Sequence, residues 1–272
     1  LVEVSAQRTT QNLVFHPFEK NAMFSTYNDI YSWDISLKDQ VNSIKTFSNE
    51  HRDRITDLKL INTHESPLTM VAMEGGSIKV WRNMAPVTFS SLCPEEMSPP
   101  KKPSLATAFF MFDEFNPHRT TDIVTNLCWQ QSRNRLIAGG GHRVVRLWDA
   151  QSERKIRDIV PDVDIVTSIS TDDSNQICLS SEDGLIKIFD ERSQMTRPVF
   201  SIRQHNSSVV AAKVWPLSSS SGGSINIVSG NRDGQISWFD QRLPSKPVRC
   251  ESGFGSPLTA MTFHENLDVF AW

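Results

Sequence analysis

The chain has 272 residues, 38% of them hydrophobic and 22% charged, which allows a packed core in one large all-β domain or two ordinary domains. The formal net charge of −3 excludes an electrostatic basis for nucleic-acid binding, because phosphate binding needs a concentrated positive surface. No apolar run approaches the ~20 residues that span a bilayer, so direct membrane insertion is not expected. The four cysteines form no Cys-x-x-Cys pair, and we expect reduced thiols in a cytoplasmic protein.

One sequence pattern recurs five times along the chain: a Gly- or Asp-marked turn, a strand of alternating apolar and polar residues, and a closing aromatic. The closing aromatics are Trp33, Trp81, Trp148, Phe189 and Phe239. An apolar strand and a short buried-looking strand precede each copy, and a more polar strand follows it. Four strands per unit, at roughly the ~40–45 residues of a WD-repeat blade, predict an all-β fold, a WD-repeat β-propeller.

The recurring unit predicts five full blades and the start of a sixth, whose apolar strand lies at 257–264. The sequence stops inside the second strand of that blade, at 268–272, where an open ring would leave strand edges unpaired. We therefore expect residues 1–272 to form one propeller domain that is incomplete at its C-terminus, with seven blades in the full protein.

A proline-bearing insertion at 85–118 follows the second closing aromatic, and we assign it to the third blade. Its prolines exclude a central strand, because proline has no N–H to donate to a neighbouring strand. The apolar run 108–112 either packs back as an outer strand or docks on a neighbouring molecule. Ser98 precedes Pro99 and two lysines follow, so Ser98 is a candidate phosphorylation site; a solvated loop is the simpler interpretation.

The closing aromatics are expected to pack between blades, each burial contributing about 2–3 kcal/mol, rather than to stack on a ligand. In well-formed WD repeats a His, a Ser or Thr, an Asp and the Trp form a hydrogen-bonded chain. His205, Ser229, Asp233 and Phe239 match this pattern best, although phenylalanine lacks the indole N–H. Asp183 and Asp233 each precede a glycine and fit the tight turn that the pattern requires.

The residues that follow Phe189 and Phe239 read Asp-x-Arg. They resemble the Trp-Asp-x-Arg box of WD-repeat receptors that dock on cullin-based ubiquitin ligases. The candidate partner-binding residues on that interpretation are Asp190, Arg192, Asp240 and Arg242. The alternative, which we favour, is that Asp and Arg hold the turn between blades by a local ion pair; Phe replaces Trp in both copies.

The sequence offers no catalytic motif. It contains no Gly-x-Ser-x-Gly, no His-Glu-x-x-His and no Walker-type loop. The glycine-rich run 139–142 lies at an expected strand turn, whereas phosphate binding favours the N-terminus of a helix. We therefore predict that the chain is not an enzyme and that it has no catalytic residue, cofactor or metal site.

Beyond the generic WD-repeat pattern, the order of several segments resembles the C-terminal propeller of the raptor family, scaffold subunits of the target-of-rapamycin kinase complex. The segments that carry the resemblance are 14–18, 33–34, 76–83, 139–149, 166–170, 182–192, 239–244 and 258–264. Their order, together with the proline-bearing insertion, is more specific than any one of them.

The resemblance implies a protein-interaction scaffold in nutrient-responsive growth signalling. It also implies protein partners, namely subunits of the kinase complex and small-GTPase recruiters at the lysosome. The expected location is cytoplasmic, with recruitment to the lysosomal surface. The family's caspase-like domain and helical repeats are not in this sequence, so substrate recruitment is not assigned to it. The second hypothesis is a WD-repeat substrate receptor of a cullin-based ubiquitin ligase.

Overall fold

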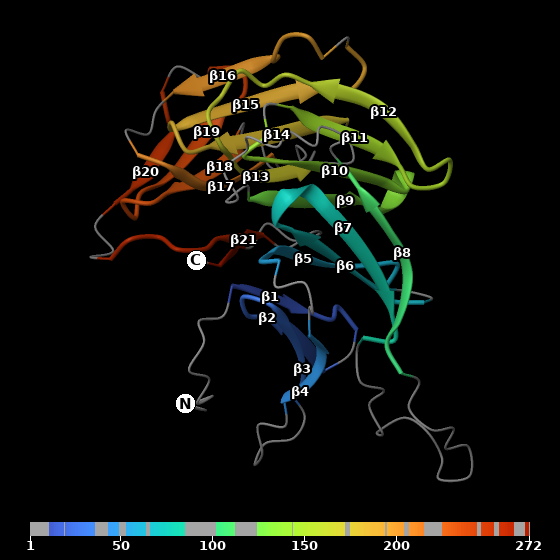
Figure 1. Cartoon of the computed structure of the whole chain (residues 1–272). Coiled ribbons are helices and arrows are strands. Elements are labelled where there is room, and N and C mark those ends of the chain that lie inside the picture. Colours follow the sequence, from blue (N-terminus) through green and yellow to red (C-terminus); the bar gives the residue numbers. More distant parts are fainter. Residues whose placement is uncertain are drawn as a thin grey trace. The chain divides into compact units, whose positions relative to one another are not determined.

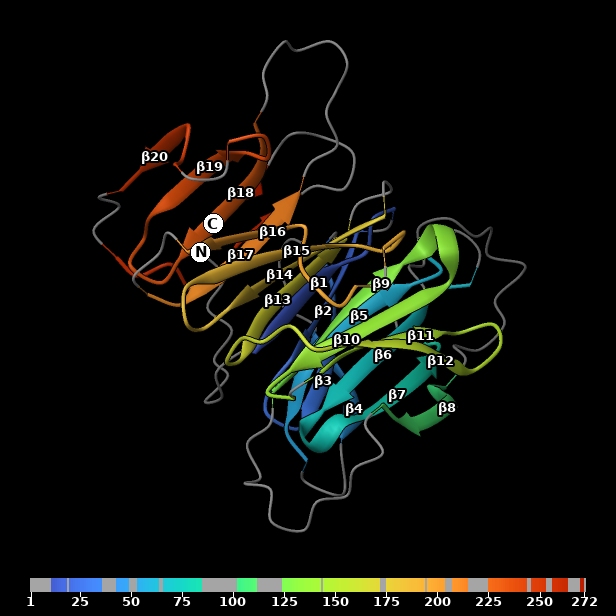
Figure 2. The ribbon, with the colours of Figure 1, turned by 90° about the horizontal axis from the view of Figure 1, so that it is seen from above.

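The computed structural model describes most of the chain between residues 11 and 271. The positions left out within that span are 19, 36–42, 49–52, 64–65, 85–101, 112–123, 143, 172–174, 194, 204–206, 215–224, 244–245, 253–255 and 264–269. The chain divides into two compact units, 1–131 and 132–272, and each is described by itself. Strands dominate both units (Figures 1 and 2).

The first unit begins with two four-stranded antiparallel sheets whose strands are neighbours in chain order. The first sheet contains β1 (Asn12–Phe15), β2 (Asn21–Ser25), β3 (Asp29–Asp34) and β4 (Ser43–Ser48). The second contains β5 (Ile55–Ile61), β6 (Leu68–Met73), β7 (Ser77–Arg82) and β8 (Ser104–Phe110). The unit ends after β9 (Thr125–Gln130).

The third sheet has the strand order β9-β10-β11-β12, and the division between the units falls after β9. Its later strands are β10 (Arg135–Gly140), β11 (Val145–Asp149) and β12 (Arg154–Ile159). The fourth sheet contains β13 (Val166–Thr171), β14 (Gln176–Ser181), β15 (Leu185–Asp190) and β16 (Phe200–Arg203). The fifth contains β17 (Val209–Val214), β18 (Ile225–Asn231), β19 (Ile236–Asp240) and β20 (Arg249–Glu251). A two-stranded sheet of β21 (Thr262–Phe263) and β22 (Phe270–Ala271) follows.

Burial follows the strand positions expected from the sequence. The second strand of a blade is buried on both faces. In β6, β10 and β14 the first residue is half-buried and all the following residues are buried. The outer strand β12 is exposed over its first four residues, which carry its three basic side chains. The core of the first unit includes Met23, Ile30, Ile55, Leu58, Val71, Met73 and Met84. The core of the second unit includes Cys178, Ile186, Ile188, Ile202, Val209, Ala212, Val214, Ile227 and Phe239.

The predicted fold is confirmed, because five four-stranded sheets with strands in chain order are propeller blades. Within the described residues the helical segments are two three-residue 3₁₀ turns, Glu74–Gly76 and Gln131–Arg133. Neither is long and apolar enough to cross a membrane. The seven-blade total and the extent of the domain stay predictions.

The insertion requires a correction. Residues 104–110 form β8, which pairs with β7 and therefore belongs to the second blade, not the third. The misassignment arose because the outer strands of other blades follow their closing aromatic closely, whereas here the proline-bearing segment separates β7 from β8. Residues 85–101 and 112–123 lie outside the described residues.

Candidate interaction sites at the blade turns

The five closing aromatics differ in burial. Phe189 and Phe239 have no exposed surface and are the largest fully buried side chains in the described residues. Trp33, Trp81 and Trp148 are instead partly exposed. The smaller ring in the fourth and fifth blades thus fills a closed site, and in these two blades Phe does not mark a loosened core.

The predicted hydrogen-bonding residues of the fifth blade differ in their exposure to solvent. Ser229 is fully buried, whereas Asp233 is exposed; His205 lies outside the described residues. Asn231 holds this turn, because its Oδ1 accepts the N–H of Gln235 at 2.8 Å. Sequence reasoning missed Asn231, although asparagine commonly hydrogen-bonds a backbone N–H a few residues along a turn.

In the fourth blade the predicted Asp183 does lie within the turn. Its Oδ1 accepts a hydrogen bond from the Ser181 hydroxyl, and the N–H of Leu185 donates to the same oxygen at 3.4 Å. The glycine after it, Gly184, has a φ of +82°, a conformation that glycine adopts without steric cost. Equivalent turns in two adjacent blades therefore use different side chains.

The two Asp-x-Arg segments form local turns after β15 and β19. Asp190 Oδ1 accepts the backbone N–H of Arg192 at 2.9 Å, and Asp240 Oδ1 accepts that of Arg242 at the same distance. Arg242 also approaches Asp240 through Nε at 3.3 Å. Both arginine side chains are exposed. The Asp240–Arg242 pair has the geometry of the turn-holding alternative; binding of a partner by these residues stays a prediction.

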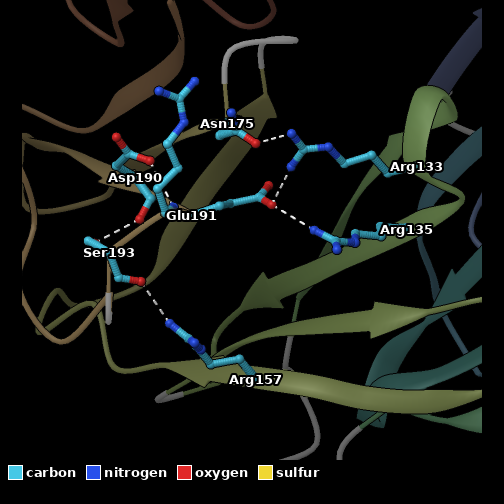
Figure 3. A network of polar contacts seen from close by, with 8 residues as sticks. Arg133, Arg135, Arg157, Asn175, Asp190, Glu191 and Ser193 are labelled. Atoms are coloured by element: carbon cyan, nitrogen blue, oxygen red, sulfur yellow. Dashed lines mark hydrogen bonds and ion pairs between the residues drawn. The ribbon is translucent and has the colours of Figure 1, made fainter.

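The side chain of the residue between Asp and Arg contacts the preceding blade, and the sequence did not predict this contact. Glu191 Oε2 accepts hydrogen bonds from Arg133 Nη1 at 2.6 Å and Arg135 Nη1 at 2.7 Å (Figure 3). In the fifth blade Gln241 Nε2 donates to Gln176 Oε1 at 2.8 Å. Arg135 and Gln176 each begin the second strand of their blade, so the two contacts are equivalent.

The Glu191 cluster extends over neighbouring turns of the third and fourth blades. Arg133 also donates to Asn175 Oδ1, and Arg157 Nη1 donates to the backbone oxygen of Ser193 at 2.9 Å (Figure 3). The Glu191 side chain is only 7% exposed, while those of Arg133 and Arg135 are 27% and 31% exposed. A buried carboxylate is thus held by two half-buried guanidinium groups, an arrangement that fixes the turn.

Charged pairs also order the outer strand β12. Arg146 donates to Asp158 through Nε at 2.7 Å and Nη2 at 3.0 Å, and Lys155 lies 3.2 Å from the same carboxylate. The hydrogen bonds from Arg146 hold the pKa of Asp158 below its ordinary value. The Ser152 hydroxyl and the Gln151 N–H likewise lower the pKa of Asp149, at the turn before β12.

A buried aspartate joins two inner strands of the first unit. Asp57 accepts the N–H of Leu58 at 2.8 Å and that of Leu127, on β9, at 2.7 Å. Lys59 lies 3.5 Å from the carboxylate, and this attraction raises the pKa of Lys59. Ser168 takes the equivalent place in the second unit, where its hydroxyl accepts the Ala212 N–H at 3.4 Å. The sequence signal was an Asp in a strand that is otherwise mostly apolar.

Within the described ranges, no group of three or more His, Cys, Asp or Glu side chains is arranged to hold a metal ion. The chemistry of the described turns is therefore hydrogen bonding and ion pairing. Ser98 lies outside the described residues, so its phosphorylation stays a prediction.

These blades define the class of protein: the chain is a WD-repeat β-propeller. The family described as "WD domain, G-beta repeat" matches residues 112–149. The structure is also similar to a solved structure of Chaetomium thermophilum Raptor, with a TM-score of 0.76 and 23% identity. That match covers 97% of this chain and 23% of the Raptor chain, and it shows the shared fold.

In sequence the chain is similar to raptor proteins over nearly its whole length, so the predicted resemblance is confirmed. It is 26% identical to "Target of rapamycin complex 1 subunit mip1" of Schizosaccharomyces pombe, over 96% of this chain and 19% of mip1. It is 25% identical to "Regulatory-associated protein of TOR 1" of Arabidopsis thaliana, over 96% of this chain and 18% of that protein. The "Protein raptor homolog" of Dictyostelium discoideum matches at 25%, over 96% of this chain and 16% of that protein. The chain therefore spans less than a fifth of the length of these relatives.

Proposed function

We propose that the chain is the propeller domain of a raptor-like scaffold subunit of target of rapamycin complex 1. One observation carries the proposal: similarity at 25–26% identity extends over 96% of the chain to a target of rapamycin complex 1 subunit of a yeast and to a regulatory-associated protein of TOR of a plant. Generic propellers share the fold, whereas this similarity in sequence extends over nearly the whole chain. The domain contributes binding surfaces and no catalytic step.

The proposal has a finer part, which rests on the resemblance. The domain supports nutrient-responsive growth signalling, resides in the cytoplasm, and is recruited to the lysosomal surface by small-GTPase recruiters. We assign contacts with other subunits to Arg192 and Arg242, which are exposed and follow turns held by Asp190 and Asp240.

Affinity purification of the tagged full-length protein from its own cells tests the coarser proposal. We expect the target-of-rapamycin kinase to co-purify. Recovery of a cullin-ligase adaptor without the kinase would overturn the proposal in favour of a ligase receptor. The relatives reported above give that second function no support.

The role of the turns is tested by removing two arginines in the full-length protein. Arg192→Ala with Arg242→Ala should lower recovery of the complex at least two-fold. The matched control is Arg154→Ala with Arg203→Ala, which removes the same charge from exposed positions on the strands β12 and β16. Equal loss in both variants would show that net charge matters rather than these turns. Imaging after amino-acid refeeding tests lysosomal recruitment separately.

A further inference from the structure

Each four-stranded sheet ends in an outer strand that has a single neighbour among the described strands. Its other edge presents backbone N–H and C=O groups to which a further strand can pair. The five outer strands are β4, β8, β12, β16 and β20. Proteins commonly protect such edges with charged side chains, above all lysine.

Three of these outer strands, β12, β16 and β20, are protected in this way, and β8 is not. Their basic residues are Arg154, Lys155, Arg157, Arg203 and Arg249. β8 reads Ser-Leu-Ala-Thr-Ala-Phe-Phe, has no charge and is the longest of the five, with 7 residues. Every position except Phe109 is exposed. Leu105 is 49% exposed and Phe110 is 66% exposed, so β8 carries exposed apolar side chains and has no second neighbour among the described strands.

The register with β7 assigns the side chains to two faces. Phe109 pairs with the buried Ile78, and Thr107 with the buried Val80. The alternate positions are outward-facing: Phe110 pairs with Ser77, and Ala108 with Lys79. A strand added beside β8 would therefore find main-chain partners along its length and an aromatic ring at one end.

The charge around β8 indicates what such a strand carries. Arg82 pairs with Ser104 at the start of β8, Lys102 lies two residues before it, and Lys79 lies beside Ala108. All three cations are on the two outermost strands or next to them, and neither strand contains an acidic residue. The complementary segment is apolar near Phe110 and acidic near Lys102.

A second copy of this chain matches that requirement poorly. Its own β8 would bring no negative charge to Lys102 and Arg82. One pair of seven-residue strands also buries much less than the roughly 1,200 Å² typical of a stable protein interface. A short extended segment, by contrast, gains affinity from the backbone hydrogen bonds themselves.

We propose that the free edge of β8 binds an extended, apolar and acidic segment of a partner protein, which adds a fifth strand to the second blade. The inference concerns an edge that the proposed function does not use, and it holds whichever complex contains the chain.

Fluorescence anisotropy on the full-length protein tests it. The probe is a fluorescein-labelled ten-residue peptide of alternating Val and Thr with a Glu pair at one end, made with the pair at either terminus. Control peptides carry a Lys pair, or two prolines that remove N–H donors. We expect one Glu peptide to bind, and both controls to bind at least ten-fold more weakly.

Protein variants locate the site. Ala108→Glu places a charge on the exposed edge beside Lys79 and should weaken binding at least ten-fold. Lys102→Glu should weaken it several-fold and reduce its dependence on salt. Ile156→Glu is the matched control, because it adds the same charge to the exposed and already protected strand β12 and should leave binding unchanged. Thermal unfolding checks that each variant is folded.

Hydrogen exchange gives a second readout that does not depend on the variants. The N–H of Met111 donates to Gly76 O on the β7 side, so the alternating ladder directs the N–H groups of Ala108 and Phe110 away from β7. These two amides should exchange quickly in the free protein and at least ten-fold more slowly with the Glu peptide. The proposal is overturned if they are already protected without peptide, because the edge is then covered by the protein itself. It is equally overturned if Ala108→Glu changes nothing, or if it abolishes dimerisation instead of peptide binding.

Discussion

Glu191 offers the sharpest test of how the blades of the second unit are joined. Its carboxylate is 7% exposed and accepts hydrogen bonds from Arg133 and Arg135. A hydrogen bond to a charged group contributes about 1.5–3 kcal/mol, but removal of Glu191 lets the half-buried guanidinium groups regain water. We therefore expect Glu191→Ala to lower the free energy of unfolding by about 2–3 kcal/mol, less than the sum of two such bonds.

The equivalent contact of the fifth blade suggests a second substitution that should restore part of the lost stability. There Gln176 and Gln241 occupy the places of Arg135 and Glu191, and they are joined by a neutral hydrogen bond. Glu191→Gln alone should cost about 1–2 kcal/mol, because a neutral amide meets two cations. Adding Arg135→Gln should recover at least 0.5 kcal/mol of that loss, roughly the smallest coupling expected for residues in contact. Arg192→Ala is the control and should cost less than about 0.5 kcal/mol.

Circular dichroism of the purified protein during heating measures these changes. For a domain of this size, 1 kcal/mol corresponds to roughly 2–4 °C, so Glu191→Ala should lower Tm by about 4–12 °C. Hydrogen exchange should report faster opening at 190–193, at the turn itself. A Tm within about 1 °C of the wild type would refute the argument, and so would strictly additive effects of Arg135→Gln and Glu191→Gln.

Three further variants test particular contacts. Asp158→Asn should have a lower free energy of unfolding than the wild type at neutral pH. Arg146 lowers the pKa of Asp158 below 3.8, so this difference in stability should persist above that pH and disappear as pH falls through the lowered pKa. A difference that does not change with pH in urea unfolding would contradict this. Phe239→Trp should destabilise by about 1–3 kcal/mol, measured by urea unfolding, because the Phe239 site is fully closed; a gain in stability would show that the site has room for the larger ring. Gly234→Ala should cost at least about 1 kcal/mol in the same assay, since its φ is +78° and an added Cβ would lie 2.8 Å from the Ser256 backbone oxygen; a neutral result would mean that the turn relaxes freely.

The blades could be predicted because their signals are local. In β6 and β10, strand-length apolar runs bounded by turns specify strands buried on both faces. The closing aromatic then marks the third strand and the end of each copy. The same local logic failed at β8, because the proline-bearing segment separates the strand from the β7 residues with which it pairs.

The side chains that join blades could not be predicted in this way. Asp57 reaches the Leu127 N–H, and Glu191 reaches Arg133 and Arg135, across sequence separations of 56 to 70 residues. Nothing in the neighbourhood of either acid specifies which distant group it meets. The Asp-x-Arg pattern drew the prediction to the Asp and Arg that recur in both segments, whereas the contact between blades is made by the residue between them, Glu191 or Gln241.

The middle residue of that turn decides how firmly the turn is held. Its backbone role repeats: the N–H of Ala150 donates to Asn134 O at 3.0 Å, and that of Glu191 donates to Asn175 O at 2.8 Å. Only its side chain varies: alanine at 150 has no polar group, whereas Glu191 and Gln241 reach the preceding blade. A turn fastened at both backbone and side chain loses little further entropy when it binds a partner. The fourth and fifth blades of the chain, both in the second unit, therefore present Arg192 and Arg242 on turns that are already ordered. An interaction scaffold requires this property.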